Sequence, residues 1–339
     1  MAAAMVVVLS LAACGSTGSA SSSTGTGSAS GSAAGFPVSI THAYGTTTIS
    51  SRPTRVATVG WASADNVIAL GVTPVSIPKN TYGKTVDGGY LPWTKDALDD
   101  KGVAKVDLPQ LHDESDDIDA EAIASTNPDV IIGLQSGITK EQYATLSKIA
   151  PTIAYQKVAW GDTWRDMITT TAKALGVEAK GKALISSLEK QISDDVSAYP
   201  EIKGKSAAVM YFNASKLSSF SVYTTTDVRP QFLNDLGLTT PASVTKLSKG
   251  TTSFYKDVSS ENADDFTDVD VIVTYGTSGL LKAMQKDPLL SKIPAVKRGS
   301  VVVINDDTEL ANALDPSALS IPATTKQYVK LIAAAAAKV

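Results

Sequence analysis

Short apolar runs alternate with segments of helical periodicity along the first half of the chain. Residues 55–59 predict a buried strand, residues 63–70 a helix, and Gly71 ends that helix before a second strand at 72–77. Strand, helix and strand in short succession indicate a parallel α/β sheet. The pattern continues with a helix at 118–126, a strand at 130–134, a helix at 140–148 and a strand at 151–155.

The second half of the chain shows the same kind of alternation. Strands are predicted at 206–211, 271–275 and 301–304, and helices at 230–236, 260–265, 280–286 and from about 324 onward. The helix at 230–236 ends at Gly237, as the earlier one ends at Gly71.

Parts of the two halves correspond closely enough to predict an internal repeat. Residues 118–123 followed by 128–132 match residues 258–263 followed by 269–273. The sequence Leu-Ser-Lys-Ile also follows in both halves, beginning at Leu146 and at Leu290. Chance agreement of short apolar patterns is the alternative, but three elements recur in the same order. We therefore expect two similar lobes.

Residues 178–199 lie between the halves and predict one long helix. Its apolar residues at helical spacing are Leu184, Ile185, Leu188 and Ile192. A helix of ~21 residues would be about 31 Å long, enough to act as a strut between two small domains. We predict lobes at 36–162 and 201–339 and a helical connector at 163–200, which permits only modest hinge closure.

The N-terminal segment has the features of an export signal. An apolar run at 5–13 ends at Cys14, and residues 15–35 are almost entirely Gly, Ser, Ala and Thr, a flexible tether with a reach of about 25 Å. Residues 11–15 resemble the bacterial lipobox, which implies a signal peptide at 1–14 and a lipid on Cys14. Such a lipid would anchor the exported chain to the outer face of the cytoplasmic membrane. The segment lacks a basic n-region, so we expect the true translation start to lie upstream. A structural cysteine is the alternative.

Composition excludes several classes of function. The chain has 339 residues and a net charge of −4, so nothing favours nucleic-acid binding. His42 and His112 are the only histidines, which argues against direct capture of zinc or manganese. No nucleophile elbow is present, and residues 176–183 lack the Ser or Thr of a P-loop. A secreted α/β hydrolase is therefore a weak alternative. We expect a protein that has no catalytic activity and holds no resident cofactor.

Several segments resemble iron-siderophore substrate-binding proteins of the actinobacterial type. The similar segments are 36–49, 52–56, 91–94, 146–152, 160–164 and 232–238, within a resemblance that covers roughly 36–322. The resemblance implies a class III periplasmic-binding-protein fold, with two α/β lobes of mainly parallel sheets joined by one long α-helix. It also implies a monomer that carries a pre-formed ferric siderophore to the permease of an ABC importer. A binding protein for haem or a corrinoid is the nearest alternative, and the type and charge of the siderophore stay open.

Ligands on open parallel sheets bind beyond the carboxyl ends of the strands, where aromatic and polar residues gather in this sequence. Aromatic faces can cover the organic rim of a chelate, while Arg and amide groups bind its oxygens. The candidate ligand-binding residues are Trp61, Tyr82, Tyr90, Trp93, Gln135, Ser136, Trp160, Trp164, Asn213, Arg229, Tyr275 and Asn305. Each Trp is as well explained by a place in the core.

Glu121 and Glu261 occupy equivalent places in the repeat, near the start of a predicted surface helix. Stabilisation of the helix dipole is one explanation, worth about 0.3–1 kcal/mol. The family resemblance implies another, in which one acidic residue on each lobe docks onto the permease.

Overall fold

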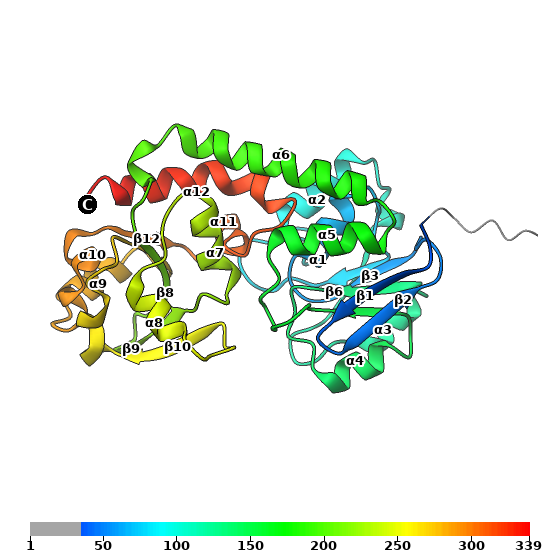
Figure 1. Cartoon of the computed structure of the whole chain (residues 1–339), viewed down its shortest axis with the longest axis horizontal. Coiled ribbons are helices and arrows are strands. Elements are labelled where there is room, and N and C mark those ends of the chain that lie inside the picture. The colour runs from blue at the N-terminus through cyan, green and yellow to red at the C-terminus, as the bar shows by residue number, and fades with distance from the viewer. Residues whose placement is uncertain (1–34) are drawn as a thin grey trace, which may run out of the picture. The chain divides into compact units, whose positions relative to one another are not determined.

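Two five-stranded sheets, one in each lobe, organise residues 35–339, the part of the chain that this computed structural model describes (Figure 1). The predicted signal peptide, Cys14 and nearly all of the predicted tether lie outside the described residues. Within the described part, no helix has the length and apolar character that crossing a bilayer requires.

The sheet of the N-terminal lobe is parallel throughout. In sheet order its strands are β5 (Gln110–His112), β4 (Ser76–Pro78), β3 (Val56–Thr58), β6 (Val130–Gly133) and β7 (Thr152–Ala154). Its helices are α1 (Ser63–Ala69), α2 (Pro92–Asp100), α3 (Ala120–Ser125), α4 (Lys140–Leu146) and α5 (Trp164–Ala174), with the 3-10 helix η1 (Lys105–Asp107). The central strands are buried on both faces, which explains their continuous apolar runs. An antiparallel hairpin, β1 (Val38–His42) and β2 (Gly45–Ile49), precedes this sheet and was not predicted.

The sheet of the C-terminal lobe is mixed. In sheet order its strands are β10 (Tyr255–Ser259), β9 (Lys216–Tyr223), β8 (Ala207–Asn213), β11 (Val271–Tyr275) and β12 (Val301–Ile304). Its helices are α7 (Val228–Asp235), α8 (Ala242–Ser248), α9 (Leu280–Lys286), α10 (Pro294–Arg298), α11 (Glu309–Ala313) and α12 (Ser320–Ala336). The 3-10 helices are η2 (Pro200–Ile202), η3 (Ser260–Phe266) and η4 (Leu290–Lys292).

The two lobes are alike along one half of each sheet. Strands β8, β11 and β12 are parallel and follow the order of β3, β6 and β7, whereas β9 and β10 are antiparallel where β4 and β5 are parallel. The predicted fold class, two α/β lobes with mainly parallel sheets, is confirmed. The predicted helix at 260–265 is instead the 3-10 helix η3, with a kink at Asn262.

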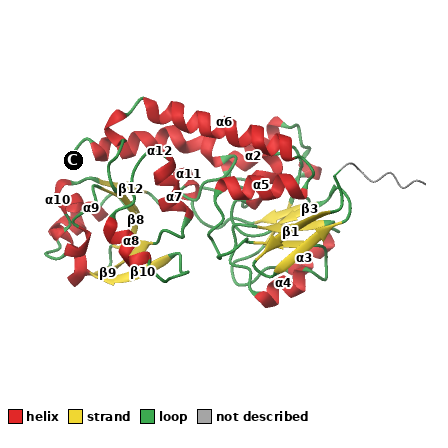
Figure 2. Ribbon diagram, viewed as in Figure 1, coloured by secondary structure: helices red, strands yellow, loops and turns green. Residues whose placement is uncertain are grey.

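The long helix α6 (Glu178–Ser197) runs alongside α12. Helix α6 extends over both lobes, whereas α12 lies over the C-terminal lobe (Figures 1 and 2). Leu188 and Ile192 of α6 are buried in a hydrophobic core that includes Phe232 of α7 and Trp164 of α5. The expected connector at 163–200 contains two helices, α5 and α6. Helix α5 packs against α1 and β1, so it belongs to the N-terminal lobe.

A segment of the C-terminal lobe returns to contact the N-terminal lobe, which the sequence did not suggest. We call residues 309–319 the return segment. Glu309 pairs with Lys84 at 2.7 Å, and the Asn312 amide donates to the Lys84 carbonyl at 3.0 Å. Farther along, Ser317 Oγ donates to the buried carboxylate of Asp65 in α1. The lobes are thus joined by direct bonds as well as by the helix α6.

Candidate functional site

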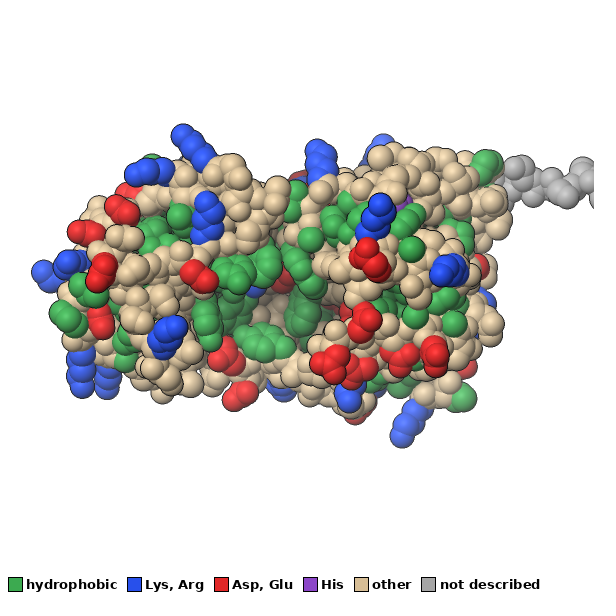
Figure 3. Space-filling model, turned by 90° about the horizontal axis from the view of Figure 1, so that it is seen from below, with side chains coloured by type: hydrophobic (Ala, Val, Ile, Leu, Met, Phe, Trp, Pro, Cys, Tyr) green, Lys and Arg blue, Asp and Glu red, His purple; other side chains and the backbone are tan. Residues whose placement is uncertain are grey.

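A cavity of about 250 Å³ lies between the lobes, and both lobes and the return segment contribute residues to its wall. The N-terminal lobe supplies Trp61, Tyr82 and Trp160, the C-terminal lobe Arg229, Phe254 and Tyr275, and the return segment Ala311, Asn312 and Asp315. Figure 3 shows hydrophobic side chains gathered at the hollow between the lobes. The wall is therefore largely aromatic, with a few polar groups among the rings.

Trp61 is positioned by the turn that follows β3. Gly60 has φ +74°, and a Cβ atom there would lie 2.4 Å from the Gln135 carbonyl oxygen, so only glycine fits. This close approach lets the Trp61 amide donate to the same carbonyl at 2.7 Å. The loops after β3 and β6 are thereby fixed to each other at the cavity.

Trp160 is held in an unusual backbone conformation, with φ +62°. A bulky residue at positive φ is rare, and such strain tends to occur at functional sites. Its amide donates to the Ser136 carbonyl at 3.1 Å. Gly137 leaves space for the indole, because a Cβ at Gly137 would lie 2.7 Å from Nε1 of Trp160.

Arg229 is the cationic group of the wall, and Asp227 holds it in place. Asp227 caps α7 and is fully buried, and its carboxylate accepts from Nε and Nη2 of Arg229 at 2.8 and 2.6 Å. The guanidinium lies 4.1 Å from the ring centroid of Tyr223, a cation–π contact. Burial opposes the charge, but Asp227 outweighs that effect and raises the pKa of Arg229. The remaining Nη1 approaches the Tyr275 hydroxyl at 3.5 Å.

Asp315 is the acidic group of the wall. Its two oxygens accept from Nε2 of Gln135 at 3.2 and 3.0 Å. Burial raises the pKa of Asp315 to about 6, although the charge of Arg229 opposes the rise. Two buried amide oxygens, Gln135 Oε1 and Asn312 Oδ1, have no hydrogen-bond partner in the described part of the chain.

The structure brings part of the predicted site together. Those of the predicted residues that line the cavity are Trp61, Tyr82, Trp160, Arg229 and Tyr275. Gln135 and Ser136 lie behind the wall, where they hold Asp315 and Trp160. Sequence reasoning missed Phe254, Asn312 and Asp315, which lie outside the repeated elements. A search for aromatic residues in every predicted loop would have found Phe254.

Three predicted residues lie in the core instead. Tyr90 is 6% exposed and donates to the Pro109 carbonyl, and the indole of Trp93 donates to Asp65 at 2.8 Å. Trp164 is 1% exposed and donates to Asp235 at 2.8 Å. For these residues the prediction of a place on the cleft wall is wrong, because each ring fills the core and its polar group has an internal partner.

Two further predicted residues lie at the surface, away from the cavity wall. Asn213 is exposed at the end of β8, where its side chain accepts from the Ser215 amide in the turn that leads to β9. Asn305 is exposed after β12 and accepts from the Asp307 amide. Both side chains stabilise turns.

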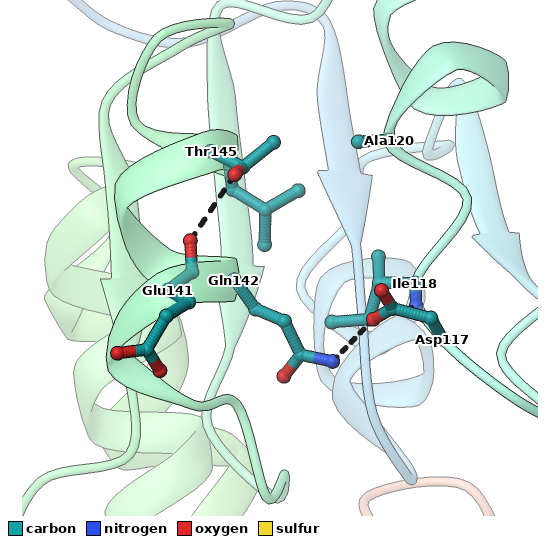
Figure 4. Close-up of a pocket in the computed structure, with 7 residues that line it drawn as sticks. Asp117, Ile118, Ala120, Glu141, Gln142 and Thr145 are labelled. Atoms are coloured by element: carbon teal, nitrogen blue, oxygen red, sulfur yellow. Dashed lines mark hydrogen bonds between the residues drawn. The ribbon is translucent and has the colours of Figure 1, made fainter.

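A second, smaller cavity of about 130 Å³ lies in the N-terminal lobe between the start of α3 and α4 (Figure 4). Asp117 and Gln142 are hydrogen-bonded across it at 2.5 Å. Glu121 lies nearby in the first turn of α3, and Glu261 lies in the first turn of η3; both are exposed. Each glutamate thus lies in the first turn of its helix, and a role of either in docking stays a prediction.

The two histidines are bound to protein groups. Nε2 of His42 lies 2.9 Å from the Thr47 hydroxyl, and Nε2 of His112 lies 2.9 Å from Glu114. Burial lowers the pKa of His42. Within residues 35–339, no three His, Cys, Asp or Glu side chains gather as a metal site would require.

Comparison with known proteins gives the same fold and several related sequences. The crystal structure of PiaA from Streptococcus pneumoniae TIGR4 in complex with ferrichrome matches with a TM-score of 0.85, at 42% identity over 89% of this chain and 99% of that chain. The probable siderophore-binding lipoprotein YfiY of Bacillus subtilis (strain 168) is 29% identical over 62% of this chain and 60% of its own length, less than two thirds of that relative.

A third relative covers more of this chain than YfiY does. The ferric enterobactin-binding periplasmic protein FepB of Escherichia coli O6:H1 is 26% identical over 81% of this chain and 86% of its own length. The family resemblance seen in the sequence is thereby confirmed. Residues 56–308 match the family described as periplasmic binding protein, and this chain belongs to that family.

Proposed function

We propose that this protein binds a ferric siderophore in the inter-lobe cavity, outside the cytoplasm, and delivers it to an ABC importer. The observation that carries the proposal is the composition of the wall, where aromatic rings from both lobes surround one guanidinium. Trp61, Trp160 and Phe254 offer apolar faces to the organic rim of a chelate. Arg229 Nη1 and the Tyr275 hydroxyl offer hydrogen bonds to the oxygens around iron.

The size of the cavity supports a ligand held at an open mouth. A volume of about 250 Å³ is below the ~300–1,000 Å³ of pockets that enclose drug-sized ligands. A chelate would fill it and project beyond the rim, where the exposed ring of Tyr82 lies. Because the siderophore already completes the coordination of iron, the wall needs no metal ligands of its own.

The relatives support the same substrate class. The PiaA structure contains ferrichrome, FepB is named for ferric enterobactin, and YfiY is named as a probable siderophore-binding lipoprotein. The proposed role includes export, anchorage through a lipid on Cys14 and action as a monomer. It includes neither catalysis nor a resident cofactor.

Tryptophan fluorescence provides the test. The purified protein is titrated with ferrichrome, ferric enterobactin, haem and cobalamin, and the iron-free siderophores serve as controls. We expect saturable binding of at least one ferric siderophore. Saturable binding of haem or cobalamin alone, or of none of the four, would refute the proposal.

A further inference from the structure

The charges at the cavity restrict which siderophore it can accept. Apart from tyrosines, two of the lining residues are ionisable, Arg229 and Asp315. Asp227 stands directly behind Arg229, and Asp306 lies at the rim, where it accepts from the Tyr82 hydroxyl at 3.0 Å. Lys84 is also near the rim, but Glu309 pairs with it at 2.7 Å. Acidic groups thus outnumber basic groups around this site.

Asp227 largely neutralises the positive charge of Arg229, so this charge attracts an anion only weakly. Two of its three nitrogens are bonded to the fully buried carboxylate of Asp227, in a pair whose net charge is zero. Nη1 can still donate a hydrogen bond toward the cavity. A ligand oxygen would therefore meet a donor group but almost no net positive potential.

Asp315 forms no ion pair with any described residue, although the charge of Arg229 acts on it from a greater distance. Among residues 35–339, the side chain that donates to its oxygens is that of Gln135, which is neutral. With a pKa of about 6, the carboxyl is mostly ionised at neutral pH. A ligand in the cavity therefore meets a partly buried negative charge, which repels anions more strongly than an exposed charge would.

Resting on the proposed function, we infer that the ligand is a ferric hydroxamate chelate without net negative charge, and that Asp315 disfavours anionic chelates. Three hydroxamate groups carry one negative charge each and balance the charge of Fe³⁺. Three catecholate groups carry two each, so their complex is a trianion, and citrate complexes are also anionic. Transfer of a trianion into this site would require unpaired cations, and the wall holds none.

Competitive titration of four iron-loaded chelates tests the inference. Ferrichrome is neutral, ferrioxamine B carries one positive charge, and ferric enterobactin and ferric dicitrate are anionic. We expect the two hydroxamates to bind at least about 100-fold more tightly than the two anions, since a like charge in a partly buried site is strongly unfavourable. The result that overturns the inference is an anionic chelate that binds as tightly as ferrichrome. That result leaves the proposed function intact, whereas failure of all four to bind refutes the proposed function itself.

The variant Asp315→Asn tests the role of the carboxylate. Its amide oxygen can still accept from Gln135, so the wall keeps its shape while it loses a charge. We expect the affinity for ferric enterobactin to rise about tenfold relative to the affinity for ferrichrome, because only the anionic chelate is repelled by the carboxylate. The matched control is Asp264→Asn, which removes the same charge from an exposed position outside the cavity wall. An equal gain for both chelates, or an equal effect of the control, contradicts the assignment of Asp315.

Discussion

Arg229 and Asp227 stand two residues apart and form a largely buried ion pair, with Nη2 of Arg229 2.6 Å from Oδ2 of Asp227. The Asp227 side chain is 0% exposed and the Arg229 side chain 16% exposed. Because the same carboxylate caps α7, the pair sets the start of that helix as well as the position of the guanidinium. One side chain therefore serves both stability and the site.

Loss of either partner should destabilise the fold. We expect Asp227→Ala or Arg229→Ala to lower the free energy of unfolding by about 3–5 kcal/mol, because each leaves a buried charge unpaired. Urea titration followed by circular dichroism measures this change. Lys190→Ala is the control, since it breaks an exposed pair with Asp194 and should leave stability nearly unchanged. Equal stability of the Asp227 variant and the native protein would contradict the analysis.

The tryptophans on the cavity wall should matter for binding, unlike those of the core. We expect Trp61→Ala and Trp160→Ala each to weaken binding of the best chelate about tenfold, since each removes an aromatic face. Trp93→Phe is the control: it should lower the melting temperature, through loss of the bond to Asp65, but leave affinity unchanged. Isothermal titration and thermal melts separate these effects. Unchanged affinity in both alanine variants would remove these rings from the site.

Gly137 should be required for the position of Trp160. In Gly137→Ala the added methyl group would lie 2.7 Å from Trp160 Nε1, so the indole must move and affinity should fall several-fold. Gly279→Ala is a matched control, because a Cβ there meets no atom within 4 Å. A crystal structure of the Gly137 variant would reveal the displaced ring. If affinity is retained, the orientation of Trp160 does not matter for binding.

Asp162 should make stability depend on pH. Burial raises the pKa of Asp162 to about 7, so the folded state binds its proton more tightly than the unfolded state does. Stability is then lost as the pH rises from about 4 to about 7, by a few kcal/mol at most. We expect Asp162→Asn, which can still accept from the Gln156 amide, to be more stable than the native protein at pH 8 and similar at pH 4. Urea unfolding at both values measures this, and a difference that does not grow with pH would contradict the assignment.

Glu121 and Glu261 should act in the delivery of the chelate to the importer. We expect the double variant Glu121→Ala and Glu261→Ala to keep its affinity for the chelate and its melting temperature, while uptake of radioactive iron by cells falls. Glu201→Ala, an exposed glutamate at the start of η2, is the control. Normal uptake by cells that carry the double variant would show that these carboxylates do not dock.

Sequence patterns predicted the strands that are buried along their whole length. The run at 271–275 is buried throughout and apolar except at Thr274, and the prediction matches β11 at both ends. Strands β9 and β10 were missed because polar residues interrupt them, so they lack the continuous apolar runs that marked the other strands. The hairpin of β1 and β2 was missed for the same reason: threonines and serines occupy its exposed positions.

The candidate site was only partly predictable. The rule that ligands lie beyond strand ends located Trp61 and Tyr275, because these residues follow or end a clear strand. It could not separate Trp160 from Trp164, since an aromatic ring suits a core as well as a ligand. The position of Asp315 in the wall could not be predicted from the sequence. It depends on the contact between the return segment and the other lobe, a long-range contact that leaves no local sequence pattern.

The bonds of the return segment have a mechanical consequence for ligand exchange. Asn312 and Asp315 belong by sequence to the C-terminal lobe, yet their amide and carboxylate are fastened to Lys84 and Gln135 of the other lobe. If the lobes rock apart, these residues stay with the N-terminal side or their bonds break. The base of the binding site is thereby fixed to the N-terminal lobe. A chelate would enter and leave where the exposed ring of Tyr82 separates from the buried ring of Tyr275, which it now meets edge to face.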